Sequence, residues 1–384
     1  MERTGRTSQT GSGPTDLRVL VVNAGSSSLK VSLVGPEDEV SAEHEFEATG
    51  GHVDDARLEG AIRAMGGVDA VGHRVVHGGP RYPESVRIDA DVIRYLVTIT
   101  DLAPLHLPAS LAAIAAVREV MPRAPAVACF DTAFHSRMPA AASTYAIPLE
   151  WRQRYGVRRY GFHGFSHAWA SRRAAQMLSS PGTGLKVVTC HLGAGASVAA
   201  VWGGRSMDTT MGFTPLEGLV MATRSGSIDP GLVLWLQRHA GLNDAQMMEA
   251  LDRHSGLQAL AGTGDMKVLL EMLAAGDEGA RLGFDVYVHR LRGCIASMAS
   301  AMGGMDVLVF TGGVGENASP VRAATVSGLR FLGVEIDRAL NANVAGDADI
   351  SAPSAAVPTL VVKAHEDIEV AREVRRVLSA PAAV

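Results

Sequence analysis

The hydrophobic pattern predicts that the ordered chain begins with a β-hairpin. Residues 19–34 read VLVVNAGSSSLKVSLV, so two apolar, β-rich runs flank a turn of Asn, Gly and Ser. Residues 186–201, KVVTCHLGAGASVAAV, repeat this arrangement with a second turn of small residues. Paired runs on either side of a short polar turn are typical of hairpins. Because only two copies occur, they indicate a duplicated unit, and we expect two similar domains facing one cleft.

Helical periodicity lies between these hairpins. Apolar residues recur at helical spacing after Pro108, after Phe165 and from Ala280 to Met302. A third glycine-rich turn, at 306–317, follows an apolar strand-like run and precedes a segment with helical character. The alternation of strands and helices predicts an α/β fold. Residues 371–380 form a short amphipathic pattern, which we expect to be a helix packed on the first domain.

The length of 384 residues exceeds one ordinary core and suits two domains. We place the first at residues 17–135 together with about 368–384, and the second at 136–367. Residues 1–16 are rich in Ser, Thr and Gly and lack an apolar core, so they are predicted to be a disordered tail and not a signal peptide.

Composition excludes several classes of function. A net charge of −5 offers no broad basic surface, so nucleic-acid binding is not expected. No run approaches the roughly 18 apolar residues of a membrane span. The three cysteines lack the paired spacing of a disulfide framework or a zinc site. The sequence therefore predicts a soluble protein of a reducing compartment, the cytoplasm.

The turn at residues 23–28, NAGSSS, is a candidate phosphate site. Its small residues let the backbone approach a ligand closely, while amide and hydroxyl groups can donate to anionic oxygens, and Lys30 follows shortly after. A single turn of this kind is more often an ordinary hairpin turn. Its repetition at 191–197 and the third glycine-rich turn favour a phosphate cradle. No Walker A motif occurs.

Five charged or titratable residues are candidates for chemistry near these turns. Arg74 and Arg224 each lie beside glycines, and a guanidinium offers a planar fork to a carboxylate or phosphoryl group, although either could be a surface cation. Asp131 and Glu366 follow apolar runs, as ligands of Mg²⁺ do in α/β folds, although Asp131 could be a helix N-cap. His163 has glycine neighbours, although a lone histidine is more often structural.

The motifs together resemble those of the acetate kinase family over residues 19–372. The matching segments are VNAGSSSLK, GHRVVHGG, APLH, FDTAFH, RRYGFHG, HLGxGAS, TPLEGLVM with TRSG, and FTGGVGEN, in the order and approximate spacing of that family. The resemblance implies the sugar kinase, heat-shock 70 and actin superfamily, in which two ribonuclease-H-like domains close over a nucleotide. It also implies a homodimer that uses ATP, acetate or another short-chain carboxylate, and Mg²⁺ or Mn²⁺.

Residue roles are carried over from the family motifs. The phosphate region of the first domain is implied for Asn23, Ser26, Ser28 and Lys30. Nucleotide contacts in the second domain are implied for His191, Gly193, Gly195, Asp265, Gly313, Gly315 and Asn317. Carboxylate and phosphoryl binding falls to Arg74 and Arg224, transition-state stabilisation to His163, catalysis and metal binding to Asp131, and further metal contacts to Glu366 and Asn23. The acyl pocket is implied for Val76, Leu105, Phe162 and Pro215.

The sequence departs from the family pattern at several positions. Ala194 replaces an asparagine, Ala222 a glycine, Ser227 an aspartate, Phe165 a threonine and Lys267 an arginine, and Ala364-His365 alters the segment before Glu366. The expected activity is phosphoryl transfer from ATP to acetate. Three alternatives stay open: a propionate or butyrate kinase, a pyrophosphate-using relative, and a nucleotide-binding paralogue without turnover.

Overall fold

The computed structural model describes residues 16–25, 28–47, 54–104, 106–180 and 184–380. Ser26, Leu105 and nearly all of the predicted tail lie outside these residues. The described chain forms two compact units, one running to Phe130 and resuming at Asp367, the other spanning Asp131–Glu366. The domain boundaries given above stay a prediction.

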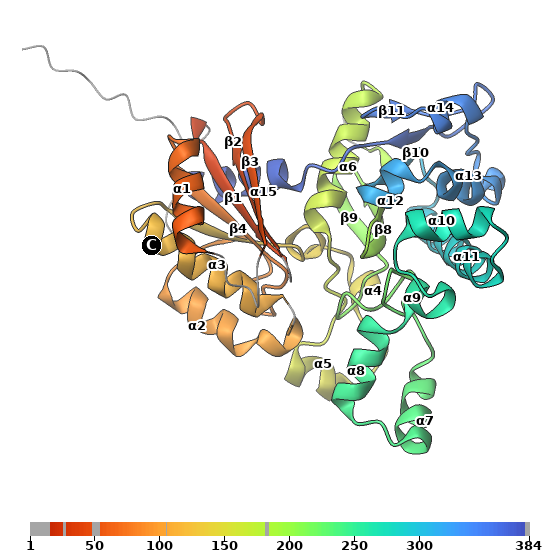
Figure 1. Ribbon diagram of the computed structural model, residues 1–384, viewed down its shortest axis with the longest axis horizontal. Coiled ribbons are helices and arrows are strands. Elements are labelled where there is room, and N and C mark those ends of the chain that lie inside the picture. The colour runs from red at the N-terminus through yellow and green to blue at the C-terminus, as the bar shows by residue number, and fades with distance from the viewer. Residues whose placement is uncertain (1–15, 26–27, 48–53, 105, 181–183, 381–384) are drawn as a thin grey trace, which may run out of the picture. The chain divides into compact units, whose positions relative to one another are not determined.

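Each unit is built on a mixed six-stranded sheet. The first sheet contains β1 (Val19–Ala24), β2 (Ser28–Val34), β3 (Val40–Glu47), β4 (Ala70–Val75), β5 (Val86–Arg87) and β6 (Ala126–Phe130). The second contains β7 (Lys186–Leu192), β8 (Ala196–Trp202), β9 (Arg205–Thr209), β10 (Val307–Thr311), β11 (Ala348–Asp349) and β12 (Thr359–Val361). Figure 1 shows both sheets with their helices.

The two sheets share one topology. The first has the order β3-β2-β1-β4-β6-β5, and the second, read from its other edge, has β9-β8-β7-β10-β12-β11. In each, two antiparallel pairs precede two parallel pairs, and a short antiparallel strand closes the edge. Every strand of the first unit thus has its counterpart six strands later. The duplicated α/β architecture and both predicted hairpins, β1–β2 and β7–β8, are confirmed.

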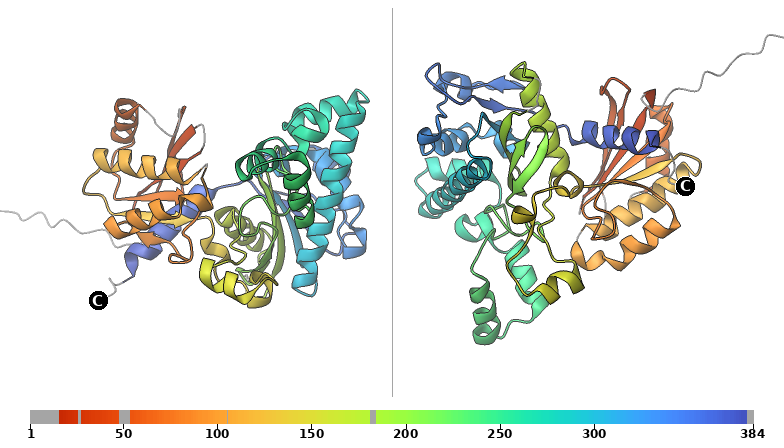
Figure 2. Two further views of the ribbon diagram at one scale, coloured as in Figure 1. Left: turned by 90° about the horizontal axis from the view of Figure 1, so that it is seen from below. Right: turned by 180° about the vertical axis from the view of Figure 1, so that it is seen from behind.

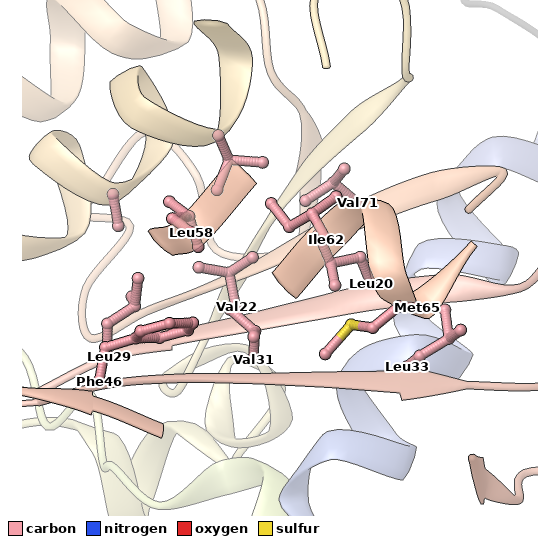
Figure 3. Close-up of a cluster of buried hydrophobic side chains, with 12 residues drawn as sticks. Leu20, Val22, Leu29, Val31, Leu33, Phe46, Leu58, Ile62, Met65 and Val71 are labelled. Atoms are coloured by element: carbon pink, nitrogen blue, oxygen red, sulfur yellow. The ribbon is translucent and has the colours of Figure 1, made fainter. Parts of the chain in front are cut away.

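Helices cover both faces of the first sheet. The helices of this unit are α1 (Asp55–Met65), α2 (Ala90–Thr98), α3 (Leu107–Val120) and α15 (Glu366–Ser379). A buried cluster joins one sheet face to α1 and α3, and Figure 3 shows Leu58 and Ile62 of α1 above Leu20 and Val22 of β1. On the other face, a methyl group on Gly72 would stand 2.6 Å from Val374 of α15, so that helix lies directly against β4. Figure 2 shows α15 along this sheet.

Ion pairs also hold α15 in the first unit. Arg375 is 8% exposed and donates to Asp38 at 3.0 Å and to the carbonyl oxygen of Gly35 at 2.6 Å. Arg372 pairs with Asp38 as well. These contacts therefore hold α15 against the β2–β3 turn, and α15 packs as part of the first unit.

The second unit sandwiches its sheet between α6 and α11. Its helices are α4 (Ala140–Ser143), α5 (Leu149–Tyr155), α6 (Gly164–Met177), α7 (Pro230–Ala240), α8 (Asp244–Arg253), α9 (Gly256–Ala261), α10 (Met266–Ala274), α11 (Glu278–Ala301), α12 (Gly312–Asn317), α13 (Ser319–Ser327) and α14 (Arg338–Ala342). Ala170 and Ala174 of α6 pack on the buried strand residues of one face. The long α11 contacts β7, β8 and β9. Within the described residues, no helix combines the length and apolar composition needed to cross a bilayer.

Candidate active site

The glycine-rich turn between β7 and β8 is flanked by an imidazole and a guanidinium. The turn is closed by the Gly193 N–H, which donates to the Gly195 carbonyl at 2.9 Å. A methyl group built on Gly195 would stand 3.3 Å from Nε2 of His163 and 3.6 Å from Nη1 of Arg224. Two of the predicted catalytic side chains therefore converge on the backbone of one predicted phosphate loop.

His163 is held by the start of α6. It precedes the helix in a left-handed conformation, with φ of 56° and ψ of 29°, which histidine adopts more readily than β-branched residues do. The Gly164 N–H donates to the carbonyl of Asp131 at 3.0 Å, and a methyl group on Gly164 would lie 2.3 Å from that oxygen. Glycine is therefore required here, and the contact places the start of α6 beside the residue that follows β6.

A hydroxyl group joins two histidines behind this turn. Ser197 Oγ lies 2.9 Å from Nδ1 of His163 and 2.7 Å from Nε2 of His167. Nδ1 of His167 lies 2.7 Å from Oγ1 of Thr189. The ring of His163 also lies over that of His191, with centroids 4.3 Å apart. These contacts fix the imidazole of His163 and leave its Nε2 edge toward Gly195.

Buried histidines predict that acid destabilises this unit. Burial lowers the pKa of His135 to about 4, and burial with repulsion from His135 and His191 lowers the pKa of His167 well below its ordinary value. As the pH falls, these histidines are protonated at a higher pH in the unfolded protein than in the folded one. We therefore expect the free energy of unfolding to be highest above pH 6.5 and to fall as the pH drops toward 4. The expected loss is about 3 kcal/mol for His135 alone. Urea unfolding between pH 7.5 and 4 measures this loss.

A matched pair of variants isolates the cause. His135→Asn should flatten the pH dependence of the urea midpoint, whereas His44→Asn, at an exposed position of β3, should leave it unchanged. An equal slope in both variants would contradict the assignment to His135.

Arg224 is positioned by an ion pair and by a loop. Its Nε donates to Asp252 Oδ1 at 2.8 Å, and both side chains are less than one-fifth exposed. Its Nη1 donates to the carbonyl of Pro215 at 3.4 Å, which ties it to one predicted wall of the acyl pocket. Sequence reasoning missed Asp252, because no motif marks an acid on α8 as the partner of an arginine 28 residues earlier.

The third glycine-rich turn lies next to the β7–β8 hairpin. Thr311, at the end of β10, is in register with His191 of β7, and α12 begins immediately after it. Gly312 has a φ of 78°, and a methyl group there would lie 2.8 Å from the carbonyl of Leu192. Within α12, Asn317 Nδ2 donates to the carbonyl of Gly313 at 2.8 Å. Gly313, Gly315 and Asn317 are thus brought to one short helix beside the predicted phosphate loop.

Asp265 is the N-cap of α10. Its Oδ1 accepts from the Lys267 N–H at 2.8 Å, which is the usual structural role of an aspartate at this position. One carboxylate oxygen is therefore committed to the helix, and a contact between Asp265 and a nucleotide stays a prediction.

The first unit gathers a separate set of predicted residues on its central strands. Asn23 of β1 is in register with Arg74 of β4 and with Lys30 of β2, so the three side chains share one face. Arg74 Nη1 donates to Asn23 Oδ1 at 3.2 Å, and Lys30 forms a 2.9 Å ion pair with Glu43. Ser28 begins β2, and Val76 directly follows β4.

Asp131 and Glu366 are the acidic candidates for metal binding. Among the described residues, no group of three or more His, Cys, Asp or Glu side chains is arranged to hold a metal ion. Asp131 is 2% exposed, and Glu366 begins α15. Mg²⁺ typically binds one or two carboxylates together with water and substrate phosphates, so carboxylate oxygens such as these are suitable ligands.

Four residues that depart from the family pattern, Ala194, Ala222, Ser227 and Phe165, are hydrogen-bonded or buried in the structure. Ser227 and Gly218 exchange two hydrogen bonds of 3.0 and 3.1 Å, which close the segment that carries Arg224. The Ala222 N–H donates to the carbonyl of Ala194 at 3.1 Å, so these two positions hold the segment of Arg224 against the predicted phosphate loop. Phe165 is buried in α6, with 5% of its surface exposed.

Two sheets of one topology, with small-residue turns at the ends of their central strands, define the class of kinases and ATPases with duplicated ribonuclease-H-like domains. The sequence profile of the Acetokinase family matches residues 52–372, and the chain belongs to that family. An acetate kinase of Deinococcus deserti is 49% identical over 324 residues, which cover 84% of this chain and 81% of that relative.

Solved structures of this family have the same fold. An acetate kinase of Porphyromonas gingivalis matches with a TM-score of 0.85 and 34% identity, covering 94% of this chain and all of that one. A propionate kinase of Francisella tularensis matches with the same TM-score and identity, covering 93% and 98% of the two chains. The relatives therefore include kinases of two different short-chain carboxylates.

Proposed function

We propose that this protein is an acetate kinase, which transfers the γ-phosphoryl group of ATP to acetate and gives acetyl phosphate and ADP reversibly. The observation that carries this proposal is the convergence of His163 Nε2 and Arg224 Nη1 on the backbone of Gly195. A phosphoryl group held at this turn would meet two side-chain donors. Hydrogen-bond donors directed at the charge that develops in the transition state usually make the largest single contribution to catalysis.

The proposed chemistry is direct in-line transfer. A carboxylate oxygen of acetate bonds to the γ-phosphorus while the bond from that phosphorus to the bridging oxygen of ADP breaks. Acetate is already ionised at neutral pH, so no general base is required. His163 acts by donating a hydrogen bond to an equatorial phosphoryl oxygen, and Arg224 neutralises charge beside it. Arg74 binds the carboxylate and holds it for attack.

Asp131, Glu366 and Asn23 are the proposed residues for Mg²⁺. When bound, the metal neutralises phosphate charge and orients the phosphoryl group. In the described structure, Asn23 Oδ1 accepts from Arg74. Asn23 therefore links the proposed metal site to the proposed carboxylate-binding arginine. Loss of activity in EDTA and recovery with Mg²⁺ or Mn²⁺ tests this part of the proposal.

A propionate kinase is the second candidate, and the likeness to the Francisella tularensis enzyme favours it. An apolar wall separates substrates that differ by one methylene by only about 10- to 200-fold. Relative kcat/KM values for acetate, propionate and butyrate decide between the two. The highest value with acetate supports the proposal, and the highest value with propionate replaces it.

Two further alternatives stay open, and the first, a pyrophosphate-using relative, rests on Ala194, Lys267 and Ala364-His365. Product formed from pyrophosphate and not from ATP would identify a different phosphoryl donor. Stabilisation by ADP without product from any donor would identify a nucleotide-binding paralogue. The proposal predicts product with ATP and none with pyrophosphate.

A homodimer in the cytoplasm is the proposed state of the protein. Four large apolar side chains on the neighbouring helices α7 and α8 are 42 to 57% exposed: Leu232, Leu234, Trp235 and Met248. Exposed apolar groups of this size are typical of a protein interface. Light scattering should give twice the mass of the chain. Trp235→Glu should shift it toward the monomer, and a monomeric parent protein would contradict the dimer.

A further inference from the structure

Glu217 is the centre of a polar network beside the candidate active site. Its Oε1 accepts from Arg159 Nη2 at 2.6 Å, and its Oε2 accepts from Tyr145 Oη at 2.5 Å. The side chains of Arg159 and Glu217 are 17% and 34% exposed, so the ion pair is partly shielded from water. None of the roles described above uses these three side chains.

The network connects the loop at residues 211–218 to the segment that leads into His163. Arg159 Nη1 donates to the carbonyls of Thr210 and Met211 at 3.0 and 3.1 Å. The N–H groups of Tyr160 and Gly161 donate to the carbonyl of Gly212 at 3.0 and 3.2 Å. Residues 159–161, which directly precede the segment of His163, are therefore hydrogen-bonded to residues 210–212 at the start of this loop.

The same loop contains Pro215. Beyond Pro215, the Gly218 N–H donates to Ser227 Oγ at 3.1 Å, and the carbonyl of Pro215 accepts from Arg224. One loop thus contacts the segments of both His163 and Arg224. A shift of this loop would move the predicted acyl-pocket wall relative to the phosphoryl-binding groups.

The carboxylate of Glu217 lies directly over the loop backbone. A methyl group on Gly212 would stand 1.7 Å from Glu217 Oε2 and 2.2 Å from Tyr145 Oη. Tyr145 Oη also accepts from the Phe213 N–H at 2.9 Å. Burial and the hydrogen bond to Glu217 raise the pKa of Tyr145, so the phenol keeps the proton that it donates. Arg159 and Tyr145, the two partners of Glu217, therefore both form hydrogen bonds with the backbone in the first half of the loop.

We infer that Glu217 is a positioning residue that fixes Pro215 relative to His163 and thereby sets the acyl-chain selectivity of the site. The inference rests on the proposed carboxylate kinase activity. Glu217 does not touch the reacting atoms and acts through the loop. When its charge is removed, the loop loses the ion pair to Arg159 that restrains Pro215. We then expect a longer acyl chain to be accommodated and acetate to be held less well.

The test compares Glu217→Gln with the parent protein. We expect KM for acetate to rise about tenfold and kcat/KM for propionate to fall much less, so that the acetate preference drops by roughly an order of magnitude, the scale of one methylene. KM for ATP should not change. Glu217→Asp, which keeps the charge, should recover part of the selectivity, and Tyr145→Phe should show a smaller change in the same direction.

Arg173→Gln is the matched control. It removes an ion pair of the same 2.6 Å length, between Arg173 of α6 and Asp347, that is not part of this network. The acetate preference should be unchanged in this variant. An equal loss of preference in both variants would mean that Glu217 acts only through general stability, and would overturn the inference.

Amide hydrogen exchange supplies a readout that does not depend on turnover. Glu217→Gln should speed exchange at Tyr160 and Gly161, whose N–H groups bond to Gly212, and Arg173→Gln should not. Parent protein inactive toward all short-chain carboxylates would refute the proposed function. A folded Glu217→Gln variant with parental selectivity, or with parental exchange at both amides, would refute the positioning role.

Discussion

Replacing His163 by alanine is expected to lower kcat for acetyl phosphate formation by about 100- to 1,000-fold, the usual cost of one donor to a transition-state oxygen. The reason is geometric. Ser197 holds the Nδ1 edge of the ring at 2.9 Å, and Nε2 points toward the backbone of Gly195. KM for acetate should change little, because the ground-state carboxylate is bound by other groups. Steady-state kinetics with coupled ADP detection measures both constants.

The backbone at His163 requires a second variant. Alanine is strained at a φ of 56°, whereas asparagine tolerates this conformation and keeps a side-chain N–H donor. His163→Asn should therefore retain the parental unfolding midpoint and recover part of the lost activity. Parental kcat in both variants would remove His163 from the mechanism.

Replacing Arg322 by methionine is expected to destabilise the second unit by about 3 kcal/mol or more, because buried acceptors lose a charged donor. Arg322 is 1% exposed and makes four hydrogen bonds of 2.7 to 2.8 Å. Two of them hold the carbonyls of Gly315 and Glu316 at the end of α12, and two hold Asn341 at the end of α14. Methionine has a similar length and cannot donate to any of them.

This change should also weaken nucleotide binding, because α12 carries Gly313 and Asn317. Urea unfolding measures the stability, and the rise in melting temperature with saturating ADP measures the binding. Arg330→Met is the control: its ion pair with Glu335 is at the surface and is worth at most about 1 kcal/mol. Equal destabilisation by the two substitutions would contradict the role assigned to Arg322.

Alternation and small-residue turns sufficed to predict the two hairpins and the duplication. Most buried positions of β1, β2, β7 and β8 are apolar, and their turns contain the residues that turns require. The helices at α3, α6 and α11 were predicted from apolar spacing, and the structure has them within two residues of the expected starts. Local signals of this kind are strong because each depends on neighbouring residues only.

Edge strands and contact partners could not be predicted in the same way. β3 reads VSAEHEFE and is largely exposed, so its sequence carries little apolar signal for a strand. The pairing of Lys30 with Glu43 depends on the register between β2 and β3. Likewise, the Arg224 partner Asp252 and the Arg159 partner Glu217 are selected by loop packing, which no local pattern encodes. The family motifs contain Arg159 and Glu217 and gave no indication that they meet.

Phosphoryl transfer from ATP to acetate is proposed at a site that includes Arg224. The most direct measurement traps acetyl phosphate with hydroxylamine in a reaction of Mg-ATP and acetate, with Arg224→Ala prepared in parallel as the control for contaminating host kinase. We expect strong hydroxamate formation by the parent protein and its near loss in the variant. No hydroxamate from well-folded parent protein, or an equal yield from Arg224→Ala, would contradict the proposal.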